Sequence, residues 1–305
     1  MQTLEAISRR ASALESIRGV VQTMKTLSAV NVPPYERAAT SIATFHDTVL
    51  SGLQVVLKDL DIPTGRKMNP DAPTIAIIFG SDHGLCGAFN DEVASLALER
   101  LSGFNGTPIL LAVGAKADQA LEMVGRKPLE TFLPPASADG LGRLARKLLV
   151  ALDRIISREG EATVEIFYNR RATAVTHRPV VRHLLPVDAD FLRNLSRRHW
   201  NSRVLPTYRM NPEDLFAALI RQHLFVSIFL AAAESLSAES TARLARMQQA
   251  ERAINERLED LNGVYRNARQ TQITDELMDV IAGFEAMSRQ SASDDAETFE
   301  TGNAD

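Results

Sequence analysis

The chain has 305 residues, of which 45% are hydrophobic and 24% are charged, so it has enough apolar material to bury a core. Aromatic residues make up only 6%, a low share that suits long helices rich in Ala, Leu and Arg better than one globular core. The net charge of −4 gives no overall attraction to nucleic acid or anionic lipid, and the single cysteine, Cys86, excludes an internal disulfide.

The start of the chain carries no basic region followed by an apolar run, so we expect no secretory signal. The longest apolar stretch, around Leu224–Ala233, is short and interrupted, and it predicts no membrane span. A lone cysteine fits a reducing, cytosol-like compartment. These features predict a soluble chain that meets a membrane only through a partner.

Residues 1–60 predict a coiled-coil helix. Prolines 33 and 34 cannot donate helical hydrogen bonds, so we expect a kink or a short break there, and residues 61–73 read as a linker. Alternating steps of three and four residues place one set of apolar side chains on a single helix face: Leu4, Ile7, Ala11, Leu14, Val21 and Met24. Ile17, Val20 and Leu27 widen this face.

Residues 74–205 predict an α/β domain. Strands and helices alternate along this segment, which favours a Rossmann-like, mostly parallel sheet covered on both faces. The expected strands are 74–79, 108–113, 163–168 and 180–185, with further strand material at 172–176, and the expected helices are 90–101, 115–124 and 139–158.

Residues 206–287 predict a second long helix. Asn211 is its expected N-cap, with Pro212 in the first helical position. Neither terminal stripe has enough neighbours to bury itself, so we expect the two helices to pair as a long antiparallel coiled coil. The last 18 residues, 288–305, carry five acids against one arginine and predict a disordered tail.

The segment from Gly80 to Asn90 (GSDHGLCGAFN) follows a strand and precedes a helix, where α/β enzymes often place active sites. It matches no phosphate loop, dinucleotide fingerprint or nucleophile elbow. Cys86 beside His83 leaves open an enzyme that uses a thiol or metal ligands. We favour a structural turn with glycines at positive φ and Asn90 capping the next helix. The histidine spacings predict no metal site, and nothing indicates a cofactor.

Two separated motifs resemble those of one family. Ser81–Asn90 (SDHGLCGAFN) is close to S-D-[RK]-G-L-C-G-x-[FY]-N, and Tyr265–Leu277 (YRNARQTQITDEL) is close to Y-N-x-x-R-Q-x-x-I-T-x-E-[LI]. Both are patterns of the gamma subunit of F-type ATP synthases. Segments around Arg178–Pro186 and Ser235–Met247 also look like this family in the right order, so the resemblance covers nearly residues 1–287.

The resemblance implies a non-catalytic central stalk that rotates inside a catalytic hexamer and couples ion flow through a membrane ring to the cycling of the catalytic sites. It implies the alpha and beta subunits of the hexamer, the epsilon subunit and the membrane c-ring as partners, and no nucleic acid. The implied location is peripheral, on the cytoplasmic face of a bacterial inner membrane.

The same resemblance implies partner contacts at residues of both helices. Met24 and Arg243 would lie where the helices couple to the neighbouring subunit and to each other. The remaining residues would catch loops of the catalytic subunit: Arg269, Gln270, Thr274 and Glu276.

This sequence departs from the family pattern in three places. Val20–Met24 (VVQTM) stands where I-T-x-A-M is usual, Asn31–Tyr35 (NVPPY) replaces a basic stretch, and His83 replaces a basic residue. These departures point to a divergent branch, such as the alternative sodium-translocating type. An unrelated coiled-coil scaffold is the second alternative, beside the enzyme based on Cys86 and His83.

Overall fold

The structure, a computed structural model, describes residues 3–60, 72–104, 106–173, 176–200, 203–204 and 206–300, with side chains described as far as Phe284. The chain divides into two compact units, which are described separately. One unit comprises residues 23–248, and the other comprises residues 1–22 with 249–305.

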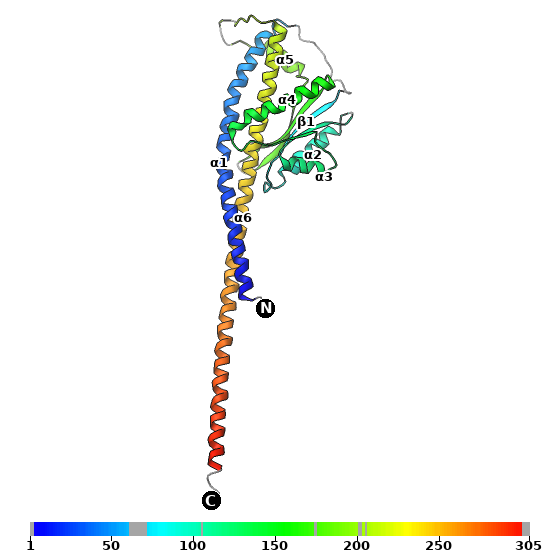
Figure 1. The fold of residues 1–305 in the computed structure, drawn as a ribbon. Helices are drawn as coiled ribbons and strands as arrows, with labels where there is room; N and C mark the ends of the chain where they lie inside the picture. The colour runs from blue at the N-terminus through cyan, green and yellow to red at the C-terminus, as the bar shows by residue number, and fades with distance from the viewer. Residues whose placement is uncertain are drawn as a thin grey trace. The chain divides into compact units, whose positions relative to one another are not determined.

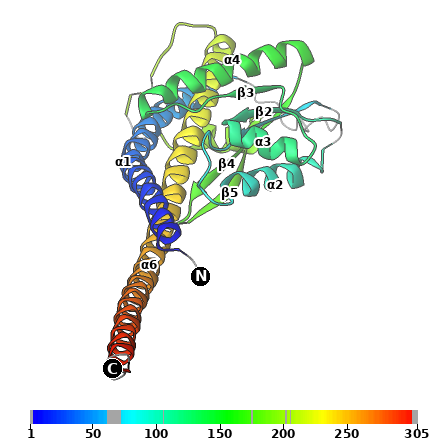
Figure 2. The same cartoon turned by 60° about the horizontal axis from the view of Figure 1, so that its bottom comes forward.

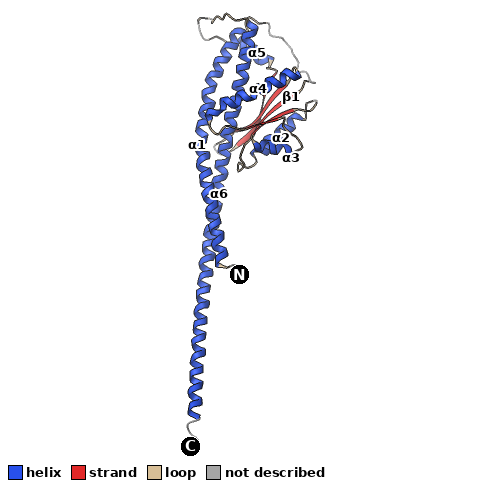
Figure 3. Ribbon diagram, in the orientation of Figure 1, coloured by secondary structure: helices blue, strands red, loops and turns tan. Residues whose placement is uncertain are grey.

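The unit of residues 23–248 contains one five-stranded sheet of order β3-β2-β1-β4-β5. Figure 3 draws its strands in red. The first four strands are parallel and β5 runs antiparallel to β4, so the predicted mostly parallel sheet is confirmed. The strands are β1 (Thr74–Phe79), β2 (Ile109–Val113), β3 (Glu130–Phe132), β4 (Thr163–Arg171) and β5 (His177–Leu185).

Helices cover both faces of this sheet (Figures 1 and 2). One face packs on α2 and α3, and the other packs on α4 and on part of α6. A sheet covered twice needs central strands that are apolar on both sides, and all six residues of β1 are buried. The helices are α2 (Phe89–Leu101), α3 (Ala115–Met123), α4 (Leu141–Glu159) and α6 (Pro212–Glu300).

Alternation along β1 shows how the two cores are divided. Ile77 and Phe79 join the core beneath α4 and α6, whereas Ala76 and Ile78 join the core beneath α2 and α3. Successive side chains of a strand point to opposite faces, so one short apolar run supplies both layers.

Helix α1 (Leu4–Val56) is continuous through Pro33–Pro34, which argues against a short break there, and the kink stays a prediction. The adjacent Tyr35 is buried, and its hydroxyl donates a hydrogen bond of 3.3 Å to the carbonyl of Pro135. Packing of this kind holds the helix where two backbone hydrogen bonds are missing, because tertiary contacts can outweigh local propensity.

Helix α6 begins as expected: the backbone N–H of Glu213 donates to Asn211 Oδ1 at 2.9 Å. The helix continues to Glu300, so the prediction of disorder from residue 288 was wrong as far as Glu300. Between Gly283 and Gly302 the sequence has neither proline nor glycine to interrupt the backbone ladder. Residues 301–305 lie outside the described part of the chain.

One stretch of α6 is long and apolar enough to cross a membrane by length and composition alone. Ile228 and Ala231 in this helix are fully buried in the core beneath the sheet, with Leu224 and Leu236 also buried there. Burial in this core therefore accounts for part of the apolar character of α6.

Three sequence expectations fail locally. The sequence predicted neither β3 nor α5 (Ala189–Arg197), which Asp188 caps by accepting from the Asp190 N–H at 2.9 Å. Of the strand material expected at 172–176, the described residues 172, 173 and 176 lie between β4 and β5 rather than in a strand, and the N–H groups of Ala172 and Thr173 donate to the carbonyl of Thr176. Residues 174 and 175, and 61–71 of the expected linker, lie outside the described residues.

The second unit pairs the start of α1 with α6 beyond residue 249. Ile7 and Val21 on α1 are buried, as are Ile254 and Leu258 on α6. Gln22 Nε2 donates to the Glu251 carboxylate at 3.3 Å, while Leu14 and Leu261 line one groove, so the helices run antiparallel, as predicted. Ile17 and Val20, expected to widen the seam, are more than half exposed.

Candidate functional site

The loop between β1 and α2 is held together by Asn90. Its Oδ1 accepts a hydrogen bond from the Ser81 N–H at 2.8 Å, and its Nδ2 donates to Ser81 Oγ at 2.9 Å. Asn90 was expected to cap α2, but the N-cap residue is Ala88, which makes no side-chain cap. Asn90 instead ties the two ends of the loop together.

Of the loop glycines expected at positive φ, only Gly87 has it, and Gly80 and Gly84 do not. Gly87 has φ +70°, and a Cβ there would lie 2.7 Å from the Arg246 side chain. Gly80 does not need a positive φ, but a Cβ on it would lie 2.5 Å from Asn90 Oδ1 and 2.6 Å from Ala117 Cβ. Close approach fixes Gly80, whereas backbone conformation and contact together fix Gly87.

Cys86 and His83 do not form a reactive pair. Cys86 is buried, 3.5 Å from Ser81 Oγ, and burial raises the pKa of its thiol. The His83 side chain is 80% exposed and lies 3.8 Å from the Asp82 carboxylate. A nucleophilic cysteine needs a lowered pKa and a base within hydrogen-bond reach, so this geometry does not favour the enzyme alternative.

Arg243 on α6 clamps the loop from the other side. Its guanidinium donates to the His83 carbonyl at 2.9 Å and to the Gly84 carbonyl at 3.3 Å, and it forms an ion pair with Glu239. Burial raises the pKa of the Glu239 carboxyl, and Arg243 opposes that rise. Glu239 was missed as a site residue, although its place four residues before an arginine was a visible signal.

Met24, the other residue expected near Arg243, is half-buried on α1 in the same unit. Its carbonyl accepts a hydrogen bond of 2.7 Å from the buried Ser28 hydroxyl. Within the described chain, the bonds of Arg243 go to its own helix and to the loop, and none goes to Met24. The partner contacts of both residues stay predictions.

The four remaining predicted residues lie on an exposed part of α6. Arg269, Gln270, Thr274 and Glu276 all face solvent. Thr274 Oγ1 donates to the Gln270 carbonyl at 2.9 Å, and Glu276 accepts from Gln272 Nε2 at 2.9 Å. Both bonds are local to the helix, so the polar side chains of this segment remain available to a partner.

Large apolar side chains accompany these polar ones. They recur at helical spacing and are between 46% and 76% exposed: Ile273, Leu277, Ile281 and Phe284. A helix that leaves an apolar stripe uncovered normally meets another surface there. We name residues 265–284 of α6 the exposed segment.

The described residues hold no cluster of three or more histidine, cysteine or acidic side chains that could bind a metal ion. Of the two segments that carry the sequence motifs, the loop is held by Asn90 and Arg243, and the exposed segment is open to solvent.

Comparison with known proteins agrees with this picture. The ATP synthase family matches residues 3–287. The chain belongs to this family. The resemblance seen in Ser81–Asn90 and Tyr265–Leu277 is thereby confirmed.

Curated relatives carry the name ATP synthase gamma chain. That of Bartonella bacilliformis is 25% identical over 94% of this chain and 100% of its own length. That of Acaryochloris marina is 28% identical over 94% of this chain and 100% of its own length. That of Bacteroides fragilis is 27% identical over 93% of this chain and 99% of its own length. Identities this low over nearly the full length fit the divergent branch that the departures indicated.

Solved structures of the family share the fold. A chain of the mitochondrial ATP synthase of Euglena gracilis, in an OSCP/F1/c-ring assembly, aligns with a TM-score of 0.59 at 17% identity, covering 93% of this chain and 94% of that one. A chain of the rotor of the same enzyme aligns with a TM-score of 0.57 at 15% identity, covering 88% and 98%. These likenesses show that the chain shares the fold of both solved chains.

Proposed function

We propose that the chain is the central-stalk subunit of an F-type ATP synthase. It couples ion flow through a membrane ring to the conformational cycle of the catalytic sites by rotating among them. The observation that carries this proposal is the family match across residues 3–287, which includes both the clamped loop and the exposed segment.

The chain itself catalyses no reaction in this proposal. A single asymmetric helix inside a ring of catalytic subunits presents a different face to each of them. Each rotational angle therefore favours a different conformation of each site, because the contacts made in each state differ in free energy. The exposed segment supplies such contacts.

Apolar and polar side chains of the exposed segment make different kinds of contact. Apolar residues such as Leu277 and Phe284 make contacts that vary little with angle, because burial and dispersion are not directional. Polar residues such as Arg269 and Glu276 make directional contacts. Exposed ion pairs are worth only about 0–1 kcal/mol each, so they form and break readily during a turn.

The proposed partners are the alpha and beta subunits of the catalytic hexamer around the exposed segment, with the epsilon subunit and the membrane c-ring at the α/β domain. The bacterial relatives support a peripheral position on the cytoplasmic face of an inner membrane. The chain meets the membrane only through the complex.

A double substitution tests the role of the exposed segment. Arg269→Ala with Gln270→Ala should lower ATP synthesis driven by an ion gradient in inverted membrane vesicles, because two directional contacts to the catalytic subunits are lost. Each lost contact is worth at most about 1 kcal/mol, so the two together should lower synthesis by up to about thirtyfold.

The matched control is Arg252→Ala with Asn255→Ala, which removes an arginine and an amide from exposed positions nearer to the start of α6. This control should leave synthesis close to the wild-type rate. Equal rates in the two double variants would remove Arg269 and Gln270 from the mechanism, while the assembly of the complex, assayed separately, would still report on the family role.

A further inference from the structure

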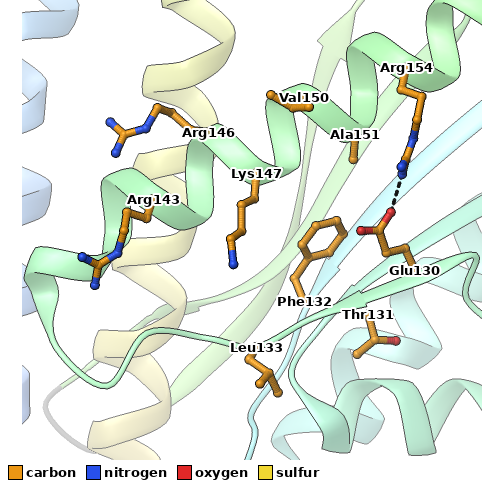
Figure 4. Close-up of a pocket in the computed structure, with 10 residues that line it drawn as sticks. All are labelled: Glu130, Thr131, Phe132, Leu133, Arg143, Arg146, Lys147, Val150, Ala151 and Arg154. Atoms are coloured by element: carbon orange, nitrogen blue, oxygen red, sulfur yellow. Dashed lines mark hydrogen bonds and ion pairs between the residues drawn. The ribbon is translucent and has the colours of Figure 1, made fainter.

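A groove on the α/β domain combines positive charge with exposed apolar side chains (Figure 4). It has a volume of about 740 Å³. One side is formed by β3 and Leu133, and the other side is formed by α4. Both elements belong to the unit of residues 23–248. The groove shares no residue with the clamped loop or the exposed segment.

Three cations on α4 line this groove without a counter-charge. Arg143, Arg146 and Lys147 are exposed, and no ion pair or hydrogen bond joins their side chains to another residue in the described ranges. Spacings of three and four place them on one side of the helix, where they repel one another. Two nearby arginines do have counter-charges, because Arg154 forms an ion pair with Glu130 and Arg221 forms one with Asp153.

Apolar side chains adjoin these cations. Leu133 is 71% exposed and Val150 is 61% exposed, whereas Phe132 between them is buried. In Figure 4 the Lys147 side chain extends from α4 toward Phe132 and Leu133. Exposed large apolar residues next to uncompensated charge are typical of a surface that binds another protein.

We infer that this groove binds an acidic segment of another protein, one in which at least two carboxylates flank a large apolar side chain. The carboxylates pair with the cations of α4, and the apolar side chain lies between Leu133 and Val150. Arginine favours this partner because its planar fork matches a carboxylate. The inference concerns a surface outside the proposed contacts of the exposed segment and does not depend on rotation.

Other modes of recognition fit less well. β3 has three residues, too short to template an added strand, so side chains rather than backbone must supply the recognition. Nucleic acid needs a broad basic surface, but Glu130 lines this groove and the whole chain has a net charge of −4.

The test measures fluorescence anisotropy with the full-length chain and a labelled peptide of about eight residues, close to the length of a strand. The peptide alternates glutamate with leucine, and the comparison peptide carries lysine in place of glutamate. The acidic peptide should bind at least about tenfold more tightly, and added salt should weaken it.

Paired variants locate the binding. Arg143→Glu with Lys147→Glu should weaken binding of the acidic peptide by at least about tenfold, because two attractive charges become repulsive. Arg126→Glu with Lys127→Glu makes the same change in net charge at exposed positions outside the groove and should have little effect. Val150→Asn tests the apolar contact without changing the charge of the groove, and it should also weaken binding of the acidic peptide.

Several results would overturn the inference. These are equal affinity for both peptides, no binding of the acidic peptide, or equal loss in the two double variants. Charge-dependent binding of vesicles rich in anionic phospholipid, without binding of the peptide, would assign the groove to lipid instead. Circular dichroism of each variant checks that a loss of binding is not a loss of fold.

Discussion

Arg243 Nη2 donates a hydrogen bond of 2.9 Å to the backbone carbonyl of His83, although 160 positions separate the two residues in the sequence. The same guanidinium forms an ion pair with the buried Glu239. One side chain therefore neutralises a buried acid and holds the loop between β1 and α2. This contact joins a segment carrying the first family motif to the helix that carries the second.

Replacing this arginine should destabilise the α/β domain. Arg243→Ala leaves the Glu239 carboxylate without its cation and two loop carbonyls without a donor. Breaking a buried pair costs about 3–5 kcal/mol, and the partial exposure of the arginine places our expectation near the lower end, at about 3 kcal/mol. Urea unfolding followed by circular dichroism measures this loss.

The pH dependence of that loss identifies its cause. Burial already raises the pKa of Glu239 in the folded chain, and removal of Arg243 raises it further. A carboxyl whose pKa is raised in the folded state stabilises the fold at pH values below its unfolded-state pKa of about 4.3. This stabilisation is lost as the pH rises through the folded-state pKa. Arg243→Ala should therefore be more destabilising at about pH 8 than at about pH 5. Adding Glu239→Gln should remove this dependence, and a loss independent of pH would exclude the explanation.

A histidine pair between α1 and α6 predicts a second pH effect. His46 Nε2 lies 3.0 Å from His223 Nδ1, and the ring of Phe191 on α5 lies 5.7 Å from that of His223. Burial lowers the pKa of His223 to about 4, and both His46 and Arg182 on β5 add to that effect. Burial and Arg182 also lower the pKa of His46, against a smaller opposing effect of Asp47.

Stability should fall as the pH drops from about 6.5 toward 4. The unfolded chain binds the proton near pH 6.5, whereas folded His223 binds it only near pH 4, so acid favours the unfolded state. The full shift corresponds to about 3 kcal/mol, which the partial exposure of both rings reduces to about 1–2 kcal/mol. The measurement is urea unfolding of wild type and His223→Leu across this range, and parallel slopes in the two proteins would contradict it.

Local chemistry explains why most of the sheet could be predicted. β1 is a continuous apolar run ended by a glycine, and its observed bounds are those expected. β3 gave no comparable signal, because only Phe132 of its three residues is buried. α5 was missed because it is short, although Asp188 is an ordinary N-cap.

The site was predicted unevenly for a different reason. Motifs located the loop and the exposed segment, since both are contiguous in sequence. The clamp made by Arg243 was not predicted, because its acceptors are backbone carbonyls far along the chain. Asn90 likewise has the residue type of a helix cap, and only the fold shows that its amide binds Ser81.

Cys86 gives a test of the enzyme alternative. Its thiol is buried and its pKa is raised, so it should react slowly with a disulfide reagent in the folded chain and rapidly after unfolding. Cys86→Ser should cost about 1 kcal/mol of stability and leave ATP synthesis by the complex nearly unchanged. Loss of activity in a variant that still assembles would instead give the thiol a chemical role.

Pro33 offers a stabilising substitution. It is exposed within a continuous helix, where a proline lacks the N–H that would bond to the carbonyl of Ala29. Pro33→Ala should raise the free energy of unfolding by about 1–3 kcal/mol. The urea midpoint measures this change, with the exposed Ser51→Ala on the same helix as a control. A decrease for Pro33→Ala would show that the proline relieves strain that alanine does not.

Observation of rotation tests the proposed function most directly. The chain would be assembled with the catalytic subunits of its own complex, the hexamer fixed to a surface, and a bead attached through a cysteine introduced by Lys127→Cys in a Cys86→Ser background. During ATP hydrolysis the bead should turn in one direction and in steps. A bead that stays still while the same fixed hexamers hydrolyse ATP would contradict the rotor role.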